Sequence, residues 1–84
     1  MATDKKFCVA GVSLFNGEWK VRYANSVGRA KVLERSGHTN IVLVDLGEDL
    51  EKIDCVDKLL GVDLGSEEAN QCVAEEAREF GFVV

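Results

Sequence analysis

The chain of 84 residues has no proline, one histidine and one tyrosine. Without proline, nothing in the sequence indicates a hinge or a polyproline ligand. The single histidine, His38, and three cysteines without C-x-x-C spacing do not form a recognised motif for a structural zinc ion. No apolar run approaches the ~20 residues of a membrane-spanning helix, so no membrane partner is expected.

Motifs that bind nucleotides or present a nucleophile are also lacking. The eight glycines form neither G-x-G-x-x-G nor a P-loop, and there is no G-x-S-x-G. We therefore predict no cofactor and no metal. Cys8, Cys55 and Cys72 are expected to be free, mostly buried thiols in a reducing compartment, and nothing local supports a catalytic pair of a cysteine with His38.

The composition indicates one globular domain over residues 1–84. Apolar residues make up 46% of the chain and charged residues 30%, which is typical of folded proteins. The net charge of −5 conceals a strong asymmetry. Residues 1–38 carry seven bases and three acids, whereas residues 39–84 carry three bases and twelve acids. Such a distribution favours a basic face on the first half.

Side-chain alternation predicts three strands. Residues 5–14 are apolar at both alternating sets of positions, which is typical of a strand covered on both faces. Asn16-Gly17 predicts a hairpin turn, and residues 18–24 alternate between apolar and charged side chains. The β-branched run over residues 41–46 predicts a third, buried strand.

Apolar stripes with three- and four-residue spacing predict helices over 26–36, 49–60 and 66–80. The resulting order, β-β-α-β-α-α, describes a small α+β domain. A right-handed helical crossover after the hairpin brings the third strand beside the first. We therefore expect a three-stranded sheet of order 2-1-3, packed with helices.

A set of basic residues in the first half is the leading candidate for a charged interaction face. Its members alternate on the second strand or lie on the first helix: Lys20, Arg22, Arg29, Lys31 and Arg35. Converging at one edge, they would suit single-stranded nucleic acid or an acidic protein. A solvated surface is the simpler interpretation. The acidic second half offers the opposite possibility, a surface that imitates the charge of DNA.

Trp19, Tyr23 and Phe82 are candidates for an apolar contact if the domain is a homodimer. The alternative is that these side chains belong to the chain's own core, because interfaces and cores use the same residue types. Sequence patterns do not separate the two.

Two further alternatives concern chemistry. His38 paired with an acid such as Asp45 would suit a small enzyme, although Gly37 and the residues after it are explained by a turn. Asp45, Glu48 and Asp49 would suit Mg²⁺, although acids at a helix start are expected on dipole grounds alone.

Several stretches resemble small proteins of tailed bacteriophages, including podovirus-like phages of marine bacteria. The resemblance covers about residues 5–60 and depends on the segments 6–13, 16–17, 20–25, 29–33 and 37–46. No activity is assigned to that group, so no functional residue is carried over. The resemblance implies a phage-encoded protein that acts in the cytoplasm of a bacterial host by binding.

Together these observations predict a protein–protein interaction module that is not an enzyme. Its partner would be a host or phage protein, or a second copy of the chain. The alternative is a nucleic-acid-binding accessory protein that uses the basic face.

Overall fold

The computed structural model describes residues 6–84, so Lys5 of the expected 5–14 strand lies outside the described residues. Its elements are β1 (Phe7–Phe15), β2 (Glu18–Ala24), α1 (Val27–Ala30), α2 (Val32–Arg35), β3 (Thr39–Leu50), α3 (Lys52–Leu59) and α4 (Glu67–Glu79). The strands form an antiparallel sheet of order β2-β1-β3. The predicted α+β class, element order and strand order are therefore confirmed.

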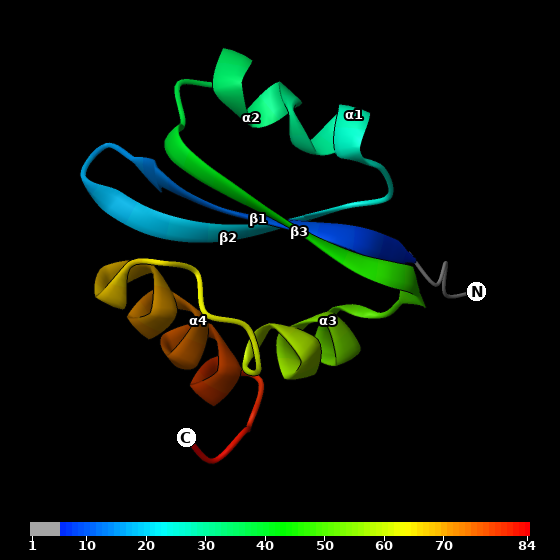
Figure 1. The fold of residues 1–84 in the computed structure, drawn as a ribbon. Coiled ribbons are helices and arrows are strands. Elements are labelled where there is room, and N and C mark those ends of the chain that lie inside the picture. Colours follow the sequence, from blue (N-terminus) through cyan, green and yellow to red (C-terminus); the bar gives the residue numbers. More distant parts are fainter. Residues whose placement is uncertain (1–5) are drawn as a thin grey trace.

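Helices cover both faces of the sheet. In Figure 1, α1 and α2 lie above the sheet, whereas α3 and α4 lie below it. The central strand β1 therefore has to pack on both sides, which explains its apolar residues at both alternating positions. Gly11 faces α2, because a Cβ atom built there would lie 2.8 Å from Cδ1 of Leu33. Ala10 and Val12 face the opposite way, into the cluster between the sheet and the helices α3 and α4.

The main core lies between the sheet and the helices α3 and α4. Its buried members are Ala10, Val12, Leu46, Cys55, Leu59, Leu64, Ala69 and Val73. Trp19, Val21 and Tyr23 of β2 pack against this cluster. The predicted alternation of β2 is thus confirmed, with the aromatic side chains turned toward α4.

The layer made by α1 and α2 is thinner. The predicted helix over 26–36 is divided at Lys31 into two single turns, and Ala30 is the only buried residue of α1 and α2. Gly28 lowers helix propensity by ~1 kcal/mol relative to alanine, and little burial is available to offset this. The predicted cap at Ser26 is confirmed, since its hydroxyl accepts the backbone N–H of Arg29 at 3.1 Å.

The third strand is longer than the predicted 41–46 segment, and the following helix begins at Lys52 instead of residue 49. Gly47 has φ +82°, and its backbone N–H donates to Oδ1 of Asp45 at 2.9 Å. This local turn inserts extra residues, after which Leu50 pairs with Phe7. Within residues 6–84, no helix has the length and apolarity needed to cross a bilayer.

Replacing Leu59 tests the main core. Leu59 is 1% exposed, whereas Ile53 on the same helix is 45% exposed. We expect Leu59→Ala to lower the free energy of unfolding by about 2–5 kcal/mol, because a cavity forms between α3 and the sheet. Ile53→Ala should cost about 1 kcal/mol or less. Urea denaturation measures both values, and equal losses would contradict the described packing.

Candidate functional site

Ser13 and His38 form the pair of side chains that most resembles a catalytic arrangement. Ser13 Oγ and His38 Nδ1 share a hydrogen bond of 2.6 Å, and the imidazole stacks on Phe15 with ring centroids 4.7 Å apart. However, Ser13 has 0% exposure and His38 has 7%. A substrate cannot reach the hydroxyl while the sheet and the α1–α2 layer stay closed. The pair therefore joins the C-terminal part of β1 to the turn that enters β3.

The carboxylates near the end of β3 make local contacts. Asp45 accepts the N–H of Gly47, as described above, and Glu48 forms an ion pair of 3.5 Å with Lys58. The same ammonium group donates to the carbonyl oxygen of Leu46 at 3.2 Å. Among residues 6–84, no three His, Cys, Asp or Glu side chains lie close enough together to hold a metal ion. The arrangement thus favours turn and ion-pair roles for these acids.

The three cysteines are all free thiols. Cys55 is buried, whereas Cys8 and Cys72 are half-buried, and Cys8 Sγ donates to the carbonyl oxygen of Asn25 at 3.1 Å. Burial raises the pKa of Cys55 and of Cys72, with smaller contributions from neighbouring carboxylates. A raised pKa keeps these two thiols protonated near neutral pH, so they are weak nucleophiles.

Two of the five basic candidates face acidic side chains. Lys20 lies 3.8 Å from Glu18, and together with Arg22 it lines a groove of 380 Å³ between β2 and α4. The helix side of this groove carries Glu75 and Glu79. These carboxylates would repel a phosphate group that approached Lys20 or Arg22.

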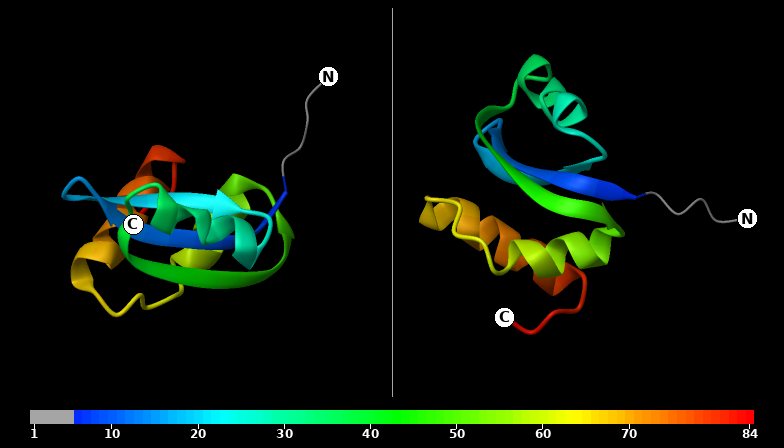
Figure 2. Two further views of the ribbon diagram at one scale, coloured as in Figure 1. Left: turned by 90° about the horizontal axis from the view of Figure 1, so that it is seen from above. Right: turned by 45° about the vertical axis from the view of Figure 1, so that its right-hand side comes forward.

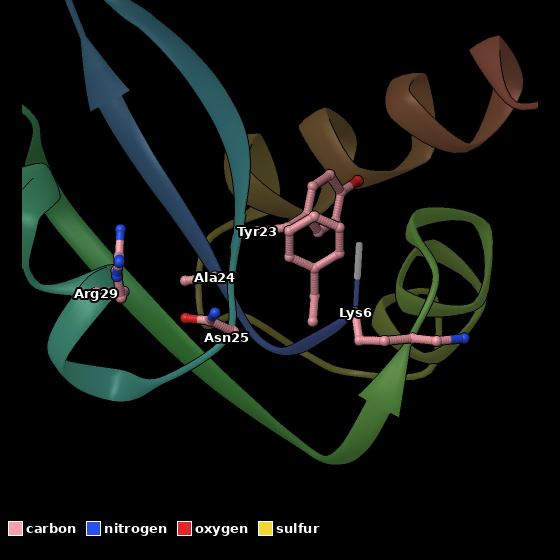
Figure 3. Close-up of a pocket in the computed structure, with 6 residues that line it drawn as sticks. Lys6, Tyr23, Ala24, Asn25 and Arg29 are labelled. Atoms are coloured by element: carbon pink, nitrogen blue, oxygen red, sulfur yellow. The ribbon is translucent and has the colours of Figure 1, made fainter. Parts of the chain in front are cut away.

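The other basic candidates lie elsewhere. Lys31 and Arg35 are exposed on the α1–α2 layer, and Arg29 lines a cavity of 410 Å³ where β2 leads into α1. Figure 3 shows that Arg29 and Lys6 point in different directions from opposite sides of this cavity. Lys6 also lies 3.9 Å from Glu51. The two charges do not converge on one anion site.

The apolar candidates make contacts within the chain. Trp19 and Tyr23 are half-buried against the main core, and the hydroxyl of Tyr23 donates to Oε2 of Glu76 at 2.8 Å. Phe82 is half-buried, and its N–H donates to the carbonyl oxygen of Ala77 at 2.9 Å, closing the end of α4. Trp19 and Tyr23 thus hold β2 against α4.

The outer edge of β3 is a surface of a different kind, because its backbone has no neighbouring strand among the described residues. In Figure 1, β3 passes in front of the other strands. Figure 2 shows it as the outer margin of the sheet, with no strand beyond it. The sequence predicts a buried strand here, but Ile41, Val42, Leu43 and Val44 are only half-buried. Helices cover the faces of β3 and leave its edge open.

Two residues with positive φ limit the regular part of this edge. Asn40 has φ +54° and Gly47 has φ +82°, and the pairing of β3 with β1 shifts register near both positions. Between them, residues 42–45 pair with β1 in regular register. The signal that sequence reasoning overlooked is the lack of charge over 41–44 in a strand that the predicted order already placed at an edge.

No protein-family model matches the chain, and no significant match was found among curated proteins or solved structures. The resemblance to phage proteins therefore stays a prediction.

Removing the buried hydroxyl tests the structural role of Ser13. Ser13→Ala leaves Nδ1 of His38 without its partner, and we expect a loss of about 1–3 kcal/mol in the free energy of unfolding. His38→Phe should cost less in the Ser13→Ala background than in the wild type, because the unpaired nitrogen is then gone. Ser36→Ala, at an exposed site, is the control, with a change of about 0.5 kcal/mol or less. Additive costs in the double-mutant cycle would contradict coupling.

The single tyrosine offers a spectroscopic test of the β2–α4 contact. Burial, and then the hydrogen bond to Glu76, raise the pKa of Tyr23 far above its ordinary value of 10.0. The folded state therefore retains the proton more strongly than the unfolded chain does. The stabilisation is complete below about pH 10 and declines as the pH rises further.

We expect no phenolate absorbance above pH 10 until the protein unfolds. Glu76→Gln should move the phenolate signal to lower pH, whereas Glu75→Gln, at an exposed site on the same helix, should not. Ultraviolet titration with circular dichroism measures both events. A reversible phenolate transition near pH 10 in the folded wild type would contradict the contact.

Proposed function

We propose that this chain is a small protein–protein interaction module, without catalytic activity, that binds its partner along the open edge of β3. The observation that supports this proposal is the unpaired apolar segment 41–44. Adding a strand to such an edge satisfies its free backbone N–H and C=O groups, and the flanking apolar side chains gain contacts.

The other edge of the sheet shows the contrast. The outer strand β2 carries Lys20 and Arg22 at its centre, and charged side chains are a common protection against unwanted strand pairing. The segment 41–44 of β3 has no such charge. One edge is thus protected and the other is suited to a partner.

The nucleic-acid alternative has weaker support. Lys20 and Arg22 share their groove with acidic side chains of α4, and Arg29 lies in a separate cavity. A phosphate backbone binds best where several cations act together. If the resemblance to phage proteins holds, the module would bind a host or phage protein, or a second copy of itself, inside the bacterial cytoplasm.

Affinity capture with edge-blocked protein tests the proposal. Ile41→Lys places a charge on the β3 edge outside the main core cluster, and Ile53→Lys makes the same change at an exposed site on α3. We expect wild type and Ile53→Lys to retain a protein partner, or untagged chain, after nuclease treatment. Ile41→Lys should retain at least about tenfold less, which corresponds to ~1.4 kcal/mol.

Circular dichroism establishes beforehand that both variants are folded, and mass spectrometry quantifies the captured proteins. If Ile41→Lys captures as much protein as the wild type, the interaction lies on another surface. Capture that disappears with nuclease would favour the nucleic-acid alternative.

A further inference from the structure

We infer that the open edge of β3 pairs with β3 of a second copy of this chain, antiparallel and about a two-fold axis. This inference rests on the proposed strand addition and names its occupant. Three features support it: the shape of the resulting sheet, the apolar segment at its centre and the charges at its two ends.

The geometry of the sheet permits this pairing. A two-fold axis perpendicular to the sheet would join two three-stranded sheets into one of six strands, in the order β2-β1-β3-β3-β1-β2. The α1–α2 layers of both copies then lie on one face, and α3 and α4 of both copies lie on the other. The new contact thus widens the sheet and keeps the helices of each kind on the same face.

The apolar segment is self-complementary. Directly opposite residues of antiparallel strands point to the same face, so the axis passes through one residue paired with its own copy. With the axis at Val42, Ile41 faces Leu43 of the second copy. With the axis at Leu43, Val42 faces Val44 of the second copy. In both registers the centre of the contact is made of half-buried apolar side chains.

Charge selects the antiparallel direction. β3 follows a segment in which exposed Lys31 and Arg35 outnumber exposed Glu34, and it ends near exposed Asp45 and Asp49, while Glu48 is paired with Lys58. Antiparallel pairing brings the acidic end of each strand beside the basic start of the other, twice in the dimer. Parallel pairing would place acids beside acids and bases beside bases.

Sedimentation equilibrium over a wide range of concentration tests the inference. We expect the wild type to approach twice the chain mass of 9.2 kDa as concentration rises. Ile41→Lys should weaken the dimer at least about tenfold, and Ile53→Lys should leave it unchanged. Added salt should also weaken it, because the end contacts are between exposed charges.

Charge reversal tests the direction of pairing. Arg35→Glu should weaken the dimer several-fold, and adding Asp49→Lys to the same chain should restore it, because opposite charges again meet across the axis. A second readout needs no variant. In hydrogen–deuterium exchange, wild-type amides over 41–44 should exchange more slowly at high concentration than at low concentration.

A chain that stays monomeric at every concentration, with unchanged exchange over 41–44, overturns the inference. A dimer whose affinity is unchanged by Ile41→Lys overturns the inference as well, because another surface must then form the dimer contact. Failure here is distinguishable from failure of the proposed function. Suppose that the chain is a monomer and that Ile41→Lys abolishes capture of a different protein. The second copy is then not the occupant of the edge, but the proposed interaction module still stands.

Discussion

In a three-stranded sheet with helices on both faces, the middle strand has to pack against both helical layers. In this sheet the middle strand is β1. Its alternating residues enter two different layers, so neither set can be polar and solvated. Toward α3 and α4, Ala10 and Val12 join a core of larger side chains. Toward α2, Gly11 lets Leu33 approach so closely that a methyl group would collide with it.

The thin layer is supported differently from the thick one. Because α1 and α2 are single turns with one buried residue, they contribute little apolar area. The buried hydrogen bond between Ser13 and His38, covered by the ring of Phe15, joins the strands where hydrophobic packing is scarce. Such a pair is stable only while both groups are satisfied, so the burial of Ser13 and His38 favours a structural role for this hydrogen bond.

A three-stranded sheet has two outer edges, and the two edges of this sheet differ. Helix α4 and the charges of Lys20 and Arg22 lie along β2, whereas the apolar centre of β3 has no neighbouring strand on its outer side among residues 6–84. Exposed bases precede β3 in the chain, and exposed acids lie near its end. In the proposed dimer, this asymmetry would favour antiparallel over parallel pairing of the two β3 strands.

Much of the fold was predictable because its signals are local. Apolar alternation on residues 5–14, the Asn16-Gly17 turn and the cap at Ser26 each depend on near neighbours in the chain. The site was not predictable in the same way. The apolar run over 41–46 indicates a strand. Which of the two edges of this strand pairs with another strand depends on residues far away in the chain.

The sequence alone determined the element types, their order and the central position of β1, since periodicity and turn chemistry act over a few residues. Only the tertiary structure decided that Trp19 and Tyr23 turn inward, that Lys20 and Arg22 meet the acids of α4, and that Ser13 meets His38. It also decided that the edge of β3 stays open. These are contacts between distant segments, and they follow from how layers pack around a narrow sheet, which no local pattern encodes.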